Sequence, residues 1–234
     1  MSVFQFKYFT VQQTDSAMKV GTDAMLLGAF VETDGKQFAL DIGTGTGVIA
    51  LMMAQKNEAI LIDAVEIDQK SANEAQLNFQ NSSWSDRLKI HHSDFLTFTS
   101  EKQFDLIVSN PPYFSTTNEN QNERKAQARH VSSLAIAPFI EKANALLSPD
   151  GSFWIIIPYN DFDLWYSHIE ANSLRISQRI NVIGKDGNEP IRCILKMNFS
   201  TIETRTKVFS IRNSDNAYSN EYVELTKEFH GVEL

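Results

Sequence analysis

Residues 38–47, FALDIGTGTG, are the part of the sequence most informative about the fold, because they join a short apolar run to three alternating glycines. Residues 38–42 are typical of a buried strand, and residues 48–55 carry the apolar pattern of a helix. Glycines allow a tight turn and a close approach of the backbone to a ligand. The start of the following helix offers free N–H groups to a polar or anionic group. The stretch therefore predicts a strand, a glycine loop and a helix that together face a ligand.

The spacing of these glycines separates the loop from two common phosphate-binding motifs. It is G-x-G-x-G, with an acidic residue, Asp41, two positions before the first glycine. The dinucleotide motif is G-x-G-x-x-G, and the phosphate-binding loop G-x-x-x-x-G-K requires a lysine that this loop lacks. On its own, a glycine-rich turn after a strand also fits a purely structural role.

After the glycine loop, apolar runs that predict strands alternate with runs that predict helices, and residues 148–151 (SPDG) predict a turn. This alternation predicts a mostly parallel sheet with helices on both faces. Beyond Pro158 one helix is followed by three strands, which predicts an antiparallel end on the sheet. The expected strands cover residues 59–65, 88–90, 104–108, 153–157, 174–183, 191–199 and 201–211, and the expected helices cover residues 69–80, 134–147 and 161–171.

The composition excludes several classes of protein. Of 234 residues 42% are hydrophobic, and the net charge is −8, so the chain is too apolar and too weakly charged to be disordered. The length fits one large domain. The single cysteine, Cys193, excludes an intrachain disulfide and a cysteine-cluster metal site, and it points to a reducing compartment. No apolar run reaches the ~18–20 residues that span a membrane, and residues 1–9 lack a signal-peptide pattern, so we expect a cytoplasmic protein.

The charge is distributed unevenly along the chain. Residues 1–116 carry eight basic and 14 acidic side chains, whereas residues 175–212 carry eight basic and three acidic ones. The acidic balance of the whole chain argues against a protein that simply coats nucleic acid. The basic segment fits either a solvated face of the late strands or a surface that contacts nucleic acid.

Carboxylates follow the next two expected strands as well. Glu66 lies roughly 20 residues beyond the glycines, where its carboxylate can accept hydrogen bonds from both ribose hydroxyls of an adenosine. Asp94 follows the third strand, where it can accept a hydrogen bond from an adenine amino group, with Phe95 beside the ring. Together with Asp41, these residues present acceptors at the edge where open α/β sheets bind ligands. Each carboxylate alone also fits a helix cap or an exposed loop acid.

The fourth expected strand ends in Ser109-Asn110-Pro111-Pro112-Tyr113. Two prolines remove two N–H donors and fix φ, so carbonyl oxygens project from a rigid turn. The amide oxygen of Asn110 and the carbonyl of Pro111 can then accept both hydrogens of an NH2 group. Acceptors that favour a tetrahedral nitrogen make its lone pair available in the transition state of a methyl transfer. Tyr113 supplies a ring on which a planar substrate can stack, so we predict that this turn is catalytic.

With the glycine loop, Glu66, Asp94 and residues 110–113, the chain resembles the class I S-adenosylmethionine-dependent methyltransferases, in the branch that methylates planar NH2 groups. The resemblance implies a Rossmann-like α/β fold, with a seven-stranded, mostly parallel sheet, an antiparallel last strand and helices on both faces. It narrows to the bacterial tRNA1(Val) adenine-N6 methyltransferases, which modify adenosine 37 beside the anticodon, and it covers residues 4–229. The segments that narrow it are MKVGTDA at 18–24, ARH at 128–130, Pro190-x-Arg192 and Tyr222-x-x-Leu225-Thr226-x-x-Phe229, after which His230 stands in place of an expected tyrosine.

By that resemblance, residues 1–35 form an N-terminal β-hairpin and helix extension that packs on the core and borders the cofactor site, and residues 36–234 form the methyltransferase domain. The implied cofactor is S-adenosylmethionine, with S-adenosylhomocysteine as its product and no metal. Lys19, Gly21 and Thr22 are expected at its methionine end. The implied cofactor-binding residues are Lys19, Gly21, Thr22, Asp41, Gly43, Thr44, Gly45, Gly47, Glu66, Ile67, Asp94, Phe95 and Asn110, and the implied catalytic residues are Asn110, Pro111, Pro112 and Tyr113.

The implied substrate is a tRNA, bound through its anticodon stem-loop region, with no membrane and no obligate protein partner. Basic residues beside the catalytic turn and on the late strands are the candidates for contacts to RNA phosphates. They are Arg124, Lys125, Arg129, Arg192, Arg205 and Lys207.

Three other functions compete with this one. A glutamine methyltransferase that acts on release factors shares the Asn110 turn, but such enzymes carry a separate N-terminal helical domain, and only 40 residues precede Asp41. A DNA adenine methyltransferase would need a target-recognition domain, which the sequence does not show. A non-catalytic scaffold that binds RNA or a partner enzyme would not need both the glycine loop and the Asn-Pro-Pro-Tyr turn.

Overall fold

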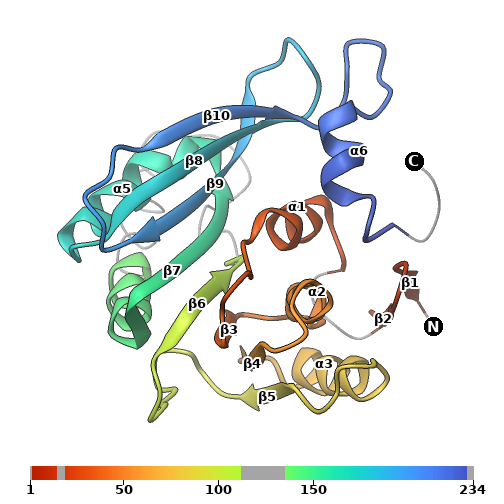
Figure 1. Cartoon of the computed structure of the whole chain (residues 1–234), viewed down its shortest axis with the longest axis vertical. Helices are drawn as coiled ribbons and strands as arrows, with labels where there is room; N and C mark the ends of the chain where they lie inside the picture. The colour runs from red at the N-terminus through yellow and green to blue at the C-terminus, as the bar shows by residue number, and fades with distance from the viewer. Residues whose placement is uncertain (1, 15–18, 112–134, 231–234) are drawn as a thin grey trace, which may run out of the picture.

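An eight-stranded sheet organises the computed structural model of the chain, which describes residues 2–14, 19–111 and 135–230 (Figure 1). The strand order across the sheet is β10-β8-β9-β7-β6-β3-β4-β5. The strands are β3 (Phe38–Ile42), β4 (Leu61–Glu66), β5 (Leu88–His92), β6 (Phe104–Ser109), β7 (Leu147–Pro158), β8 (Arg175–Ile183), β9 (Pro190–Asn198) and β10 (Arg205–Ser210).

The sheet confirms the mostly parallel α/β fold and corrects two details of it. Neighbouring strands from β5 to β7 pair in parallel, β9 pairs antiparallel with both β7 and β8, and β10 pairs in parallel with β8. The described residues therefore contain eight strands in this sheet rather than seven, and the antiparallel strand is β9 rather than the last one. The difference arises because residues 205–210 follow the β8–β9 pair and add a parallel edge strand beside β8.

The turn expected at residues 148–151 is wrong, because these residues lie within β7. Leu147 pairs with Phe104, and the pairing resumes with Ser152 opposite Leu106. The four residues between these two pairs face a single residue of β6, so they bulge out of the ladder. Proline and glycine are tolerated in a bulge as they are in a turn, which explains why the sequence pattern was misleading.

Two hydrophobic layers cover the two faces of the sheet. Along β6, Leu106 and Val108 belong to one layer and Ile107 to the other, because successive side chains of a strand point to opposite faces. The first layer packs under α1 (Thr22–Phe30), α2 (Val48–Lys56), α3 (Gln69–Gln80) and α6 (Asn220–Thr226). The second layer packs under a helix at 135–146 and under α5 (Phe162–Ala171). The short 3-10 helix η1 (Tyr159–Asp161) precedes α5.

No helix in the described part of the chain is long and apolar enough to cross a membrane.

The first residues form the expected β-hairpin, in which β1 (Val3–Gln5) pairs antiparallel with β2 (Thr10–Gln12). The buried amide of Asn78 on α3 fastens this hairpin to the rest of the molecule. Its Oδ1 accepts a hydrogen bond from the Gln12 N–H at 2.8 Å, and its Nδ2 donates to the carbonyl of Gln12 at 3.0 Å and to that of Thr46 at 2.8 Å. One side chain therefore joins the hairpin, α3 and the loop that precedes α2.

Candidate active site

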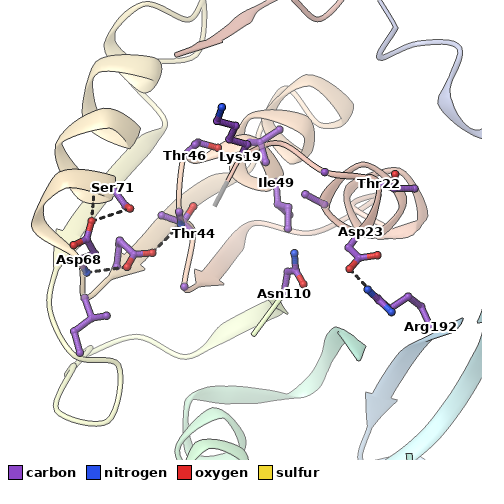
Figure 2. A pocket seen from close by; sticks show the side chains of 17 residues that line it. Lys19, Thr22, Asp23, Thr44, Thr46, Ile49, Asp68, Ser71, Asn110 and Arg192 are labelled. Atoms are coloured by element: carbon purple, nitrogen blue, oxygen red, sulfur yellow. Dashed lines mark hydrogen bonds and ion pairs between the residues drawn. The ribbon is translucent and has the colours of Figure 1, made fainter. Parts of the chain in front are cut away.

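A cavity of about 550 Å³ lies at the carboxyl ends of β3, β4 and β6 (Figure 2). This is the edge at which open α/β sheets bind ligands, and the volume lies within the ~300–1,000 Å³ range of small-molecule pockets. Asp41, Gly47, Asp94 and Phe95 do not line it. The predicted cofactor residues that do line it are Lys19, Gly21, Thr22, Gly43, Thr44, Gly45, Glu66, Ile67 and Asn110.

The glycine loop takes a backbone conformation that L side chains rarely adopt. Gly43, Gly45 and Gly47 have φ angles of 67°, 56° and 81°. At Gly47, the N-cap of α2, a Cβ atom would also lie 2.5 Å from the Phe79 ring. Gly47 thus acts from outside the cavity: it turns the chain into α2, whose first residue, Val48, lines the cavity.

Asp41 lies at the end of β3 and is fully buried. Its Oδ2 accepts a hydrogen bond from the Thr44 hydroxyl at 2.6 Å, and its Oδ1 has no hydrogen-bond partner among the described residues. Burial raises the pKa of Asp41 to about 7, although the bond from Thr44 lowers it. Asp41 therefore holds the glycine loop, and its ionised form would be stabilised by a positive charge in the cavity.

Glu66 ends β4 with both carboxylate oxygens already hydrogen-bonded. Its Oε2 accepts from the backbone N–H of Gly45 at 2.9 Å, and its Oε1 accepts from that of Asp68 at 2.8 Å. A carboxylate has about four acceptor positions, so Glu66 can accept further bonds from ligand hydroxyls. Asp68 in turn is the N-cap of α3 and accepts from the Ser71 N–H and hydroxyl at 2.8 and 2.9 Å.

No group of three or more His, Cys, Asp or Glu side chains suited to a metal ion occurs among the described residues.

Ile67 follows Glu66 and lines the cavity with an apolar side chain that is 65% exposed. Asp94 is exposed outside the cavity lining, and its Oδ1 accepts from the Leu96 N–H at 2.9 Å. Phe95 is buried in the second hydrophobic layer, with its ring centroid 5.3 Å from that of Phe139. Phe95 is thus a core residue in this structure, and the adenine contact assigned to Asp94 stays a prediction.

Asn110 follows β6 and points into the cavity (Figure 2). Its Oδ1 atom is buried and has no hydrogen-bond partner within the described part of the chain. Leaving a buried acceptor unpaired costs about 1–3 kcal/mol, so such an atom in a cavity indicates a donor on a ligand. Pro111 is buried, whereas Pro112 and Tyr113 lie outside the described residues.

Several residues that line the cavity are not among the predicted cofactor-binding residues, although most of them lie close to the predicted motifs. Asp23 and Ala24 belong to the MKVGTDA segment. Of the others, Thr46 lies within the glycine loop, Val48 and Ile49 follow it, and Asp68 and Ser71 follow Glu66. The sequence predicts Arg192 as a contact to RNA, and the structure places it in the lining of the cavity. The additional lining residues are Asp23, Ala24, Thr46, Val48, Ile49, Asp68, Ser71 and Arg192.

Three of the six predicted RNA-binding residues, Arg192, Arg205 and Lys207, lie in the described part of the chain. Arg192 lines the cavity, where its Nε donates to Asp23 Oδ2 at 2.9 Å. Arg205 is the first residue of β10 and lies at the amino end of that strand, whereas the cavity lies at the carboxyl ends of β3, β4 and β6. The ammonium of Lys207 lies 4.7 Å from the centroid of the Phe30 ring. Arg124, Lys125 and Arg129 lie outside the described residues.

Two solved structures with a similar fold carry titles that describe methyltransferases. A structure described as that of "a predicted O-methyltransferase" from Agrobacterium tumefaciens has a TM-score of 0.69 at 16% identity and covers 90% of this chain and 98% of its own. The ribosomal protein L11 methylase of Lactobacillus delbrueckii has a TM-score of 0.53 at 17% identity, covering 75% of this chain and 76% of its own. These likenesses concern the fold alone. They confirm the Rossmann-like α/β fold of the chain.

Sequence relatives identify the family. Residues 9–164 match the family model of the methyltransferase small domain. The chain is 38% identical over 234 residues to the tRNA1(Val) (adenine(37)-N6)-methyltransferase of Flavobacteriaceae bacterium strain 3519-10, with 100% of both chains covered. It is 40% identical over 227 residues to the enzyme of that name from Phocaeicola vulgatus, with 97% of each covered. The chain belongs to the tRNA1(Val) (adenine(37)-N6)-methyltransferase family, and this family and fold imply the use of S-adenosylmethionine.

Proposed function

We propose that the protein transfers a methyl group from S-adenosylmethionine to N6 of an adenosine in tRNA, and that this adenosine is nucleotide 37 of tRNA1(Val). The observation that carries the chemistry is the buried, unpaired Oδ1 atom of Asn110 in the cavity. The choice of substrate rests on relatives of that name, which match the chain over 97–100% of its length. A tRNA substrate would place the enzyme in the cytoplasm.

The cavity fits S-adenosylmethionine by the chemistry of its lining. Glu66 would accept hydrogen bonds from the ribose, Ile67 would cover the adenine, and Asp94 would accept from the adenine amino group. Residues 19–22, in the proposed extension at 1–35, would border the methionine end. When bound, the cofactor supplies an electrophilic methyl group on a positively charged sulfur, and this transfer requires no metal.

Asn110 and Pro111 would hold the target amine. The Asn110 amide oxygen and the Pro111 carbonyl accept its two hydrogens and favour a tetrahedral nitrogen, which frees the lone pair. With the cofactor bound, the nitrogen would attack its methyl carbon, the carbon–sulfur bond would break with its electron pair passing to sulfur, and the nitrogen would lose a proton to water. Pro112 would keep the turn rigid, and Tyr113 would stack on the base. The chain thus contributes position and orientation rather than a strong base.

The target adenosine would leave its stack to enter this site. Splaying a base out of an anticodon loop costs a few kcal/mol, less than in a duplex. Phosphates around the loop would meet basic side chains, for which Arg124, Lys125, Arg129, Arg205 and Lys207 remain our candidates.

Methylation of tRNA from a strain that lacks the gene tests the proposed function. The protein is incubated with radiolabelled S-adenosylmethionine and this tRNA, and the labelled nucleoside is then mapped. We expect N6-methyladenosine at position 37 of tRNA1(Val) and no label in a transcript with guanosine at that position. With Asn110→Ala we expect labelling to slow by a factor on the order of 10²–10³. Label on a release-factor glutamine, or none on any RNA, would overturn the proposal.

A further inference from the structure

A guanidinium and two aromatic rings meet beside the end of β7, and the proposed reaction gives them no role. The Cζ atom of Arg179 on β8 lies 3.6 Å from the ring centroid of Phe162 and 5.4 Å from that of Tyr159. We call these three residues the Arg179 platform. We propose that the platform binds a nucleotide beside the target adenosine of the tRNA, with its base stacked on Tyr159 and its phosphate held by Arg179. The inference rests on the proposed function, because it takes the substrate of the cavity to be RNA.

The platform lies at the same edge of the sheet as the proposed catalytic turn. β7 pairs in parallel with β6, so both strands end at this edge, where Asn110 follows β6 and Tyr159 follows β7. The register across β7 and β9 puts Arg179 level with Ser109, the last residue of β6. Arg179 is therefore three strand spacings, roughly 14 Å, from the end of β6. An RNA loop whose adenosine lies at Asn110 can reach the platform with a neighbouring nucleotide.

The side chain of Arg179 is held in place while its charge stays unpaired by any described carboxylate. Its Nε donates to Oδ1 of Asn181 at 2.8 Å, and its planar group lies over Phe162, which packs against the second hydrophobic layer. Within residues 2–14, 19–111 and 135–230, Arg179 forms no ion pair. A guanidinium has five N–H donors in a fixed fork, so donors remain for a phosphate oxygen. The site thus presents an oriented positive charge that suits an anion.

The ring of Tyr159 is placed to meet a base. The backbone of Pro158, the last residue of β7, is extended, and no residue of η1 is buried, so the chain leaves the core at this point. Tyr159 is partly exposed, and it lies within the ~6 Å at which a cation and a ring attract each other. Proteins that bind single-stranded RNA stack unpaired bases on aromatic rings and on guanidinium planes. The unpaired nucleotides of an anticodon loop match this chemistry.

Abasic tRNAs combined with variants of Tyr159 test the stacking. Each tRNA1(Val) carries one abasic nucleotide near position 37, and its affinity is measured by fluorescence anisotropy with S-adenosylhomocysteine present. We expect one neighbouring base whose removal weakens wild-type binding about tenfold to a hundredfold. Tyr159→Ala should lose the same factor with intact tRNA and nothing further with that abasic tRNA. Tyr159→Phe keeps the ring and should bind as the wild type does.

Arg179→Gln tests the phosphate contact. We expect it to weaken binding of intact tRNA and to lower the slope of log affinity against log salt by about one. Arg175→Gln is the matched control, because Arg175 is exposed at the start of β8, the end of that strand away from the cavity edge. Tyr166→Ala is the control for the ring, since Tyr166 is exposed on α5 and its ring stacks on Phe162. Both controls should bind tRNA as the wild type does.

Calorimetry with S-adenosylhomocysteine separates a lost RNA contact from a damaged fold, because the platform lies outside the cavity lining. We expect every variant to bind this ligand as the wild type does. The inference is overturned if no neighbouring base depends on Tyr159, if Arg179→Gln leaves the salt slope unchanged, or if the variants weaken S-adenosylhomocysteine and tRNA equally. A wild type that methylates no tRNA would overturn the proposed function itself, and that outcome is distinct from the other three.

Discussion

The carboxylate of Glu66 accepts a hydrogen bond from the backbone N–H of Gly45 at 2.9 Å, so the acid that ends β4 also braces the loop that follows β3. Its other oxygen accepts from the N–H of Asp68, at the start of α3. The residue that we propose for the ribose is therefore also a structural part of the glycine loop. A change at this position alters the ligand contact and the shape of the cavity together.

We expect Glu66→Gln to weaken binding of S-adenosylhomocysteine about tenfold to a hundredfold. An amide has a single acceptor oxygen, so it can serve the N–H of Gly45 or of Asp68 and presents its own NH2 group to the other. Calorimetry measures the loss. Glu58→Gln is the matched control. Glu58 is exposed and precedes the first residue of β4, whereas Glu66 is the last residue of that strand. Equal affinities in the two variants would contradict the role of Glu66.

Asn110→Ala should lower turnover far more than it lowers cofactor affinity. The Asn110 amide is proposed to act on the target amine in the transition state, and removing one such acceptor costs on the order of 10²–10³ in rate. Single-turnover methylation and calorimetry with S-adenosylhomocysteine separate the two effects. Asn160→Ala is the control, since Asn160 is exposed in η1 after the neighbouring strand β7. Parallel losses of rate and affinity would exclude the assigned role.

The buried carboxyl group of Asp41 should make the stability of the protein depend on pH. Burial raises its pKa from 3.8 to about 7. Between these values the folded protein binds a proton that the unfolded chain has released, so the free energy of unfolding falls as the pH rises through this window. Asp41→Asn removes the titration and keeps an acceptor for Thr44. We expect the free energy of unfolding of the wild type, measured with urea, to fall by a few kcal/mol more than that of this variant between about pH 4 and pH 7.

The exposed Asp34→Asn serves as the control for the pH experiment, because Asp34 lies outside the cavity and the core. Its pH dependence should follow that of the wild type. If Asp41→Asn also follows the wild type, the carboxyl group of Asp41 is not protonated in the folded state over this range.

Gly47→Ala should destabilise the protein more than Gly187→Ala. The two glycines share the same left-handed backbone, with φ of 81° and 83°, so the conformational cost of about 1–2 kcal/mol is common to both. A Cβ at Gly47 would lie 2.5 Å from the Phe79 ring, whereas nothing lies within 4 Å of one at Gly187. Thermal unfolding of the two variants isolates the contact with Phe79. Equal losses would show that the ring moves aside freely.

Arg205→Glu tests whether the late strands contact RNA. If they do, the variant should bind tRNA more weakly, and the slope of log affinity against log salt should fall by about one or more. Lys89→Glu, exposed on β5 at the other edge of the sheet, is the matched charge reversal. An unchanged slope would indicate that the basic segment is a solvated face of the late strands and does not contact RNA.

Elements with regular patterns could be predicted from the sequence. The pattern of residues 69–80 predicts α3 with the bounds that the structure gives it, and Asp68 caps it through the Ser71 N–H. The apolar runs also predict each strand of the large sheet, including the edge strand β10 that the seven-stranded family fold omits. Local patterns succeed here because each element is stabilised by its own periodicity and caps.

Features that depend on distant contacts could not be predicted. Arg192 is 169 residues from Asp23, so its charge counted towards the basic segment of late strands although its side chain lies in the cavity. Phe95 follows a strand end like Asp94, but the hydrophobic layer under residues 135–146 takes its ring. In both cases packing between elements, which no local pattern encodes, decides where the side chain lies.

The amide of Asn78, which bonds to Gln12 and to the carbonyl of Thr46, has a consequence for local unfolding. Opening the hairpin would strip this buried amide of two of its three bonds, and the third holds the backbone of the glycine loop. The hairpin is therefore not an independently fraying terminus, because the free energy that keeps it closed is shared with the loop. By thermodynamic linkage, a ligand that orders the glycine loop would also protect the amides of the first strands from hydrogen exchange.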